Sequence, residues 1–302
     1  MPAFGLLALG AALRRLLLRD DAVWAGIERL VFWVLMPSLL VSAIAPLDLA
    51  ALPLGGMALS IWLALLTGTL VSLGVARGFG LGHASMTSVV QGGIRFNNLM
   101  GFAIVGPLLG PAGTALGAVA TGLIVPCVQV LTSLVFAIGP GAGGGGGRVS
   151  PRRALRQLAL NPLLLACLLG FGLAALGGLP PGLRPLLRAL GQASIALGLL
   201  CVGAALSLGA LRSRPGVQAA TCLVKLGVMP LLTLALAHGF GLEPVPLAAA
   251  VVFMALPTAT TSYVMARAMG GDAPLMAALT TTEHLLAVLT LPLWIALLGV
   301  GG

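Results

Sequence analysis

The chain has 302 residues, of which 59% are hydrophobic and 8% are charged, and its mean hydropathy is +1.12. This composition excludes an ordinary soluble domain and predicts an all-α, polytopic membrane protein surrounded by a lipid bilayer. The formal net charge of +9 does not indicate nucleic-acid binding, because the arginines lie between apolar runs, where they orient membrane helices.

Ten apolar runs follow one another along the chain, and a spanning helix needs about 20 apolar residues. The predicted helices cover roughly residues 2–18, 22–45, 52–76, 84–109, 112–138, 158–178, 183–208, 216–238, 244–268 and 273–300. The first is the shortest, and its Arg14 and Arg15 must extend to an interface. Arginine supplies every cation except Lys225, which together with the abundant Ala, Gly and Leu is typical of a GC-rich bacterial genome. We therefore expect a bacterial cytoplasmic (inner) membrane protein.

A stretch rich in glycine and arginine, residues 139–157, divides the chain near its midpoint. Glycine at this density indicates a flexible linker rather than a spanning helix. We expect a first five-helix repeat over residues 1–138 and a second over residues 158–302. The four arginines of the linker place it in the cytoplasm, because cytoplasmic loops are enriched in positive charge.

Five helices before a cytoplasmic linker place both termini outside, and they make the two repeats inverted relative to each other. The remaining loops agree, because the expected cytoplasmic ends hold eleven arginines and the outer ends hold two. The cytoplasmic set is Arg14, Arg15, Arg19, Arg77, Arg148, Arg152, Arg153, Arg156, Arg212, Arg214 and Arg267, and the outer set is Arg184 and Arg188.

Two of the predicted helices are interrupted at matching positions of the two halves. Residues 92–101 place Arg95, Asn97 and Asn98 among three glycines, and such polar groups are tolerated in a membrane only if they face protein or a watery cavity. Residues 256–262 contain Pro257, which removes a backbone donor. Paired helix breaks in inverted halves indicate a transporter site, whose half-helix N-termini favour an anion.

Six short motifs along the chain resemble signatures of bacterial members of the auxin efflux carrier family. Each is weak alone, but together they cover nearly the whole chain. They are Ile94-Arg95-Phe96-Asn97-Asn98 with Gly110-Pro111-Ala112-Gly113, Val125-Pro126-Cys127-Val128-Gln129-Val130-Leu131, Asn161-Pro162-Leu163, Ala255-Leu256-Pro257 through Ala266-Arg267, Gly271-Asp272, and Leu289-Thr290-Leu291-Pro292-Leu293.

The resemblance implies ten helices in two inverted five-helix repeats, as in bile acid and auxin carriers, with a scaffold and a transport part in which broken helices 4 and 9 cross. The implied substrates are organic anions: auxin in plant relatives, malonate and other small carboxylates in bacterial ones. Plant relatives have a proline at both crossings, whereas Arg95-Phe96 stands in the first one here. Coupling varies within the family, so the driving force does not carry over.

The candidate substrate-binding residues are Arg95, Asn97, Asn98, Pro257, Thr258, Thr261 and Ser262. The arginine and the amides would hold a carboxylate, and the hydroxyls would face it from the other break. The alternatives are that the amides satisfy carbonyls freed by the break, that Arg95 caps its own helix, and that the hydroxyls bond back to theirs. Thr258 and Ser262 share a helical face, which favours that pair.

Glu283, His284 and Lys225 are candidates for coupling to a proton or to sodium. The alternative is a buried Glu283 that is protonated or paired with Lys225. Glu28 is expected to be an interfacial ion, and Gln129 could line a path, although helix packing is the favoured role for it.

The sequence thus predicts a secondary transporter or facilitator of small organic anions, malonate-like or auxin-like weak acids, that works by alternating access. The alternatives are a transporter-like channel or sensor and a transporter of a non-carboxylate solute. No enzyme motif, cofactor motif or metal-ligand spacing is present, and the four cysteines fit small buried hydrophobes. A homodimer is a candidate assembly, which the sequence alone does not test.

Overall fold

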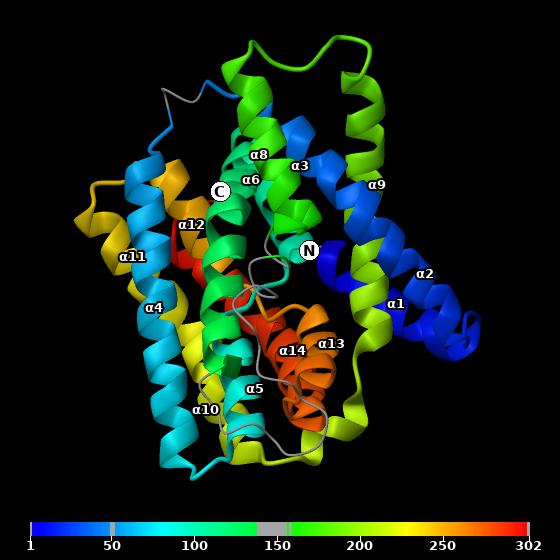
Figure 1. Ribbon diagram of the computed structural model, residues 1–302, viewed down its shortest axis with the longest axis vertical. Helices are drawn as coiled ribbons and strands as arrows, with labels where there is room; N and C mark the ends of the chain where they lie inside the picture. Colours follow the sequence, from blue (N-terminus) through cyan, green and yellow to red (C-terminus); the bar gives the residue numbers. More distant parts are fainter. Residues whose placement is uncertain (1, 49–51, 138–155, 157–158, 301–302) are drawn as a thin grey trace.

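The computed structural model describes residues 2–48, 52–137, 156 and 159–300, and these residues form helices and no β-strand (Figure 1). The all-α class is therefore confirmed. The expected linker at 139–157 lies, apart from Arg156, outside the described residues. In chain order the elements are α1 (Pro2–Leu16), α2 (Asp21–Leu30), η1 (Val31–Leu35), α3 (Met36–Ile44), α4 (Leu54–Gly78), α5 (His83–Ile94), α6 (Asn98–Ala137), α8 (Pro162–Ala175), α9 (Arg184–Ala205), η3 (Leu208–Arg212), α10 (Pro215–Leu223), η4 (Val224–Val228), α11 (Met229–Gly239), α12 (Pro244–Ala255), α13 (Thr261–Met269) and α14 (Ala273–Leu297).

Local sequence signals set several helix ends. The Asn161 side chain accepts a hydrogen bond from the Leu163 amide, and Pro162 occupies the first position of α8. Asp272 caps α14 in the same way, through the amide of Leu275. These side chains satisfy donors that a helix N-terminus leaves free, and proline at the first position sacrifices no hydrogen bond.

Two long helices contain a widened π-helical turn just before a proline. The turn η1 precedes Pro37, and the turn η4 precedes Pro230. Proline lacks an N–H group and its ring crowds the carbonyl four residues earlier, so the turn before it loosens. The first turn contributes Val31 and Phe32 to the cavity described below, and the second carries Lys225.

The 40-residue element α6 is two helices joined by a sharp reversal at Gly110, whose φ of 65° favours glycine. A Cβ atom built on Gly113 would lie 2.4 Å from the Val105 carbonyl oxygen. Eight residues of straight helix would separate these positions by about 12 Å, so the chain turns back on itself. The predicted boundary between helices 84–109 and 112–138 falls at this reversal.

Within the described residues, six helical segments are long and apolar enough to cross a membrane. They are Asp21–Ile44, Leu54–Gly78, His83–Ala137, Arg184–Ala205, Pro215–Gly239 and Ala273–Leu297. The helices α8 and α12 are apolar but shorter. The chain is a multi-pass membrane protein, whereas the count of ten spans and the inverted-repeat arrangement stay predictions.

The helices pack in two groups that meet along α6. The α9 group contains α1, α2, α3, α8 and α9, with α1 and α3 both packed on α9. The α12 group contains α4, α5, α6 and α10 to α14, with α12 packed between α6 and α11. Figure 1 shows α1, α2, α3 and α9 on one side of the molecule and α4, α10 and α11 on the other. The cavity described next lies between these groups.

Candidate functional site

Both interrupted segments are broken helices, and their unwound stretches touch. The helix α5 ends at Ile94, Arg95 is extended (φ −75°, ψ 162°), and α6 begins at Asn98. In the second half α12 ends at Ala255, and α13 begins only at Thr261. The backbone amide of Asn97 donates a hydrogen bond of 2.8 Å to the Pro257 carbonyl. The predicted contact between the two breaks is therefore present.

Aromatic packing fixes the crossing from one side. The ring of Phe253 on α12 lies edge-on to Phe102, with centroids 5.8 Å apart, and it also contacts Phe96. A Cβ atom on Gly101 would lie 2.9 Å from the Phe253 ring, and one on Gly117 would be equally close. Glycine at these positions lets both halves of α6 approach α12, which stabilises the broken geometry.

Buried polar groups satisfy the backbone of the second break. The Thr258 amide donates to Oε2 of Glu283 at 2.7 Å, and its hydroxyl lies 3.4 Å from the Gln91 carbonyl oxygen and 3.3 Å from the Ser262 hydroxyl. Thr258 and Ser262 are fully buried. Neither of them, nor Pro257, lines the cavity, so the pair that the sequence favoured holds the crossing together in this structure. Their role in substrate binding stays a prediction.

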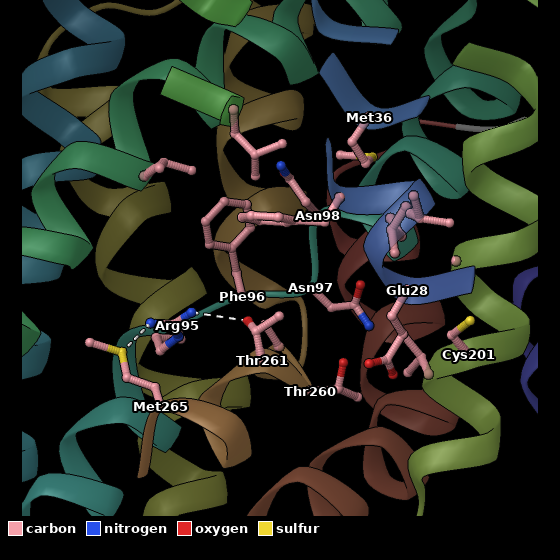
Figure 2. A pocket seen from close by; sticks show the side chains of 18 of the residues that line it. Glu28, Met36, Arg95, Phe96, Asn97, Asn98, Cys201, Thr260, Thr261 and Met265 are labelled. Atoms are coloured by element: carbon pink, nitrogen blue, oxygen red, sulfur yellow. Dashed lines mark hydrogen bonds between the residues drawn. The ribbon is translucent and has the colours of Figure 1, made fainter. Parts of the chain in front are cut away.

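A cavity of about 260 Å³ lies beside the crossing and is lined by residues of both helix groups (Figure 2). Arg95, Asn97, Asn98 and Thr261, four of the predicted substrate-binding residues, line it, and their role in binding stays a prediction. Asn98 is the first residue of α6 and Thr261 the first residue of α13, so two helix N-termini border the cavity. The polar lining residues are Glu28, Arg95, Asn97, Asn98, Gln129, Asn161, Thr260 and Thr261.

The guanidinium group of Arg95 has weak partners. Its Nη1 donates to the thioether sulfur of Met265 at 3.0 Å, and its Nη2 donates to the Thr261 hydroxyl at 3.1 Å (Figure 2). Its Nε is buried and has no hydrogen-bond partner among the described residues. A thioether is a poor acceptor, so a carboxylate would be a better partner than the present ones. The alternative that Arg95 caps a helix is not seen, because none of its side-chain bonds in the described structure reaches a backbone carbonyl.

The two asparagines have different surroundings. The amide nitrogen of Asn97 lies 3.0 Å from Nε2 of His284, and its Oδ1 accepts from the Met100 amide at 3.3 Å. The Oδ1 of Asn98 accepts from the Thr121 hydroxyl at 2.7 Å, while its amide nitrogen is buried without a partner among the described residues. The unused amide donor at this cavity therefore belongs to Asn98.

The three candidate coupling residues lie behind the cavity and do not line it. Nζ of Lys225 donates to the Met254 carbonyl at 3.1 Å, and the side chain is fully buried. Its charge and that of Glu283 influence each other, but no ion pair joins the two in the described part of the chain. One Glu283 oxygen, Oε1, has no partner among the described residues. Among the described residues, the hydrogen bond that links His284 to the cavity wall is the one to Asn97.

The sequence missed Glu28 as a site residue. Its position near a helix end indicates an interfacial ion, yet it lines the cavity, as do Gln129 and Thr260. The spacing of Glu28, Val31 and Phe32 places them on one helical face, and this was the signal available in the sequence. Glu28, Thr260 and Thr261 also line a second, adjoining cavity that holds Arg14 and Arg15 at its wall.

No group of three or more His, Cys, Asp or Glu side chains that could hold a metal ion occurs in the described part of the chain. No curated protein matches the chain significantly. Residues 148–295, which form nearly all of the second half, match the family described as membrane transport protein. This match covers the second helix break, and it is consistent with a transporter of the auxin efflux carrier-like family.

Proposed function

We propose that the protein is a secondary transporter or facilitator that moves small organic anions across the bacterial cytoplasmic membrane by alternating access. The site is the cavity between the α9 group and the α12 group, and its ligands are carboxylates of malonate-like or auxin-like weak acids. Arg95, Asn98 and Thr261 would hold the carboxylate.

The observation that carries this proposal is the set of unused donors beside the cavity. Nε of Arg95 and the amide nitrogen of Asn98 are buried without partners in the described structure. A buried donor without an acceptor costs about 1–3 kcal/mol, and a bound carboxylate would remove that cost. The N-termini of α6 and α13 add partial positive charge at the same place.

Alternating access is supported by where the cavity lies. Its wall combines Glu28, Met36 and Cys201 of the α9 group with the crossing segments of the α12 group. A relative movement of the two groups would change which side of the membrane the cavity faces. The proposal includes two inverted repeats, with both termini outside, and a homodimer. It also includes coupling to a proton or to sodium through Glu283, His284 and Lys225.

The test is uptake by proteoliposomes that contain the purified full chain, with radiolabelled malonate and indole-3-acetate as first probes and other mono- and dicarboxylates as competitors. We expect saturable uptake that Arg95→Gln abolishes. Thr290→Val is the matched control, because the Thr290 hydroxyl has no described partner and Thr290 does not line the cavity. Uptake that does not saturate would indicate a channel, and the absence of uptake and binding for every carboxylate would overturn the proposal.

A further inference from the structure

Glu28 is an acidic side chain on the wall of a cavity whose other charged group is a cation. It comes from α2, and Figure 2 shows its carboxylate turned toward the side chains of Asn97 and Thr260. Among the described residues it forms no hydrogen bond and no ion pair. Arg14, on the wall of the adjoining cavity, is instead paired with Asp21. The Glu28 carboxylate is therefore available to a ligand.

The charges of the cavity wall are balanced and separated. Arg95 and Glu28 are the two charged residues that line it among those the structure describes. They come from different helix groups, and Figure 2 shows them on opposite sides, with Asn97 and Thr261 between. A dicarboxylate bound to Arg95 would direct its second negative charge toward Glu28, where like charges repel. A solute with one charge of each sign matches the wall better.

Most of the remaining wall is apolar. Val31 and Phe32 of the π-helical turn η1, Met36 and Val128 face the cavity. Ligand sites combine an apolar lining with a few polar groups that set orientation. A volume of about 260 Å³ suits a small metabolite with a modest apolar group.

We propose that the preferred substrates are zwitterionic amino carboxylates with an apolar side chain, bound with the carboxylate at Arg95 and Asn98 and the ammonium group at Glu28. This inference rests on the proposed function, because it uses the same carboxylate site. It keeps the carboxylate site and replaces net-anionic substrates with net-neutral carboxylates that also carry an ammonium group. Glu28 is then the residue that selects carboxylates with an ammonium group over carboxylates without one.

The test compares three molecules with the same branched apolar group: leucine, 4-methylpentanoate, which lacks the amino group, and 3-methylbutylamine, which lacks the carboxylate. Each is measured by thermal shift of the purified full chain and by competition in proteoliposome uptake. We expect leucine to bind at least about tenfold more tightly than either analogue. Glu28→Gln keeps the size of the side chain and removes its charge, so it should lower the preference for leucine over 4-methylpentanoate by about tenfold. Glu243→Gln, an exposed residue at the start of α12, is the matched control and should keep the wild-type preference.

The outcomes separate the two proposals. If 4-methylpentanoate binds as tightly as leucine in the wild-type protein, or if Glu28→Gln leaves the preference unchanged, the inference is wrong and the anion proposal stands. If glycine, alanine, leucine and phenylalanine all fail to bind while their deaminated analogues bind, the inference is also wrong and the anion proposal stands. If no carboxylate binds, with or without an amino group, both proposals fail. The wild-type comparison decides the question even if the variant does not fold.

Discussion

The amide nitrogen of Asn97 lies 3.0 Å from Nε2 of His284, which links the wall of the cavity to α14. The other ring nitrogen of His284, Nδ1, lies 2.7 Å from the Thr280 carbonyl oxygen. A carbonyl oxygen only accepts, so Nδ1 carries a hydrogen and Nε2 accepts from Asn97. The neutral imidazole therefore fixes the orientation of the Asn97 side chain, and a proton added at Nε2 would break this bond.

We expect His284→Leu to lower transport by at least about tenfold, which corresponds to about 1.4 kcal/mol, because the Asn97 amide loses its acceptor. His284→Gln can still accept from Asn97 and should keep more activity than His284→Leu. Initial rates in proteoliposomes measure both. Thr290→Val on the same helix controls for a general effect on α14, and equal loss in the Leu and Gln variants would contradict the assigned hydrogen bond.

The planar guanidinium group of Arg95 should contribute to carboxylate affinity through its geometry as well as its charge. Arg95→Lys keeps a cation but loses the planar pair of donors, so carboxylate affinity should fall by about tenfold. Arg95→Gln should abolish carboxylate binding, as measured by thermal shift with a saturating ligand. If Arg95→Lys retained full affinity, a bidentate contact would be excluded and a simple point charge would suffice.

The packing of α1 against α9 depends on glycine. A Cβ atom on Gly10 would lie 2.1 Å from the Leu200 carbonyl oxygen, whereas a Cβ on Gly5, in the same helix, would meet nothing within 4 Å. We expect Gly10→Ala to lower the free energy of unfolding by about 1–3 kcal/mol or more, because backbone atoms cannot move aside easily. Gly5→Ala should leave it unchanged or raise it slightly. Thermal unfolding in detergent compares the two, and equal melting temperatures would show that α1 can separate from α9 without cost.

Lys225 and Glu283 should be energetically coupled although neither lines the cavity. Glu283→Gln leaves a fully buried ammonium group uncompensated, and Lys225→Met leaves a buried carboxylate uncompensated. Each change should cost about 3 kcal/mol of stability. The double variant removes both charges and should lose less than the sum of the two by at least about 1 kcal/mol. Additive losses in the double-mutant cycle would show that the two groups act independently.

The orientation in the membrane is open to a direct measurement. The arginine distribution predicts that the C-terminus lies outside and that the segment around Arg212 and Arg214 is cytoplasmic. Alkaline phosphatase fused to the C-terminus should therefore be active and green fluorescent protein should be dark there. Fusions that end at Ser213 should show the reverse pattern. The opposite result at both sites would invert the predicted topology.

The sequence by itself determined the membrane setting and the positions of both helix breaks. The apolar composition requires a lipid bilayer around the chain. The glycines beside Arg95 and the proline at 257 disfavour a continuous helix, because glycine loses more backbone entropy and proline lacks an N–H donor. The sequence also predicts that Arg95, Asn97, Asn98 and Thr261 face a protein interior or a cavity, because polar groups in a membrane segment need a place away from lipid.

Only the tertiary structure decided which polar groups face the cavity. The sequence places Thr258 and Ser262 on one helical face, yet Thr258 lies in the unwound stretch before α13, where its hydroxyl lies near the Gln91 carbonyl and the Ser262 hydroxyl, and neither residue lines the cavity. Glu28 lies near a helix end in the sequence, but packing of α2 against α9 brings it to the cavity wall opposite Arg95. Periodicity gives the face of a helix that a residue occupies, whereas the element that this face meets depends on contacts between residues far apart in the chain.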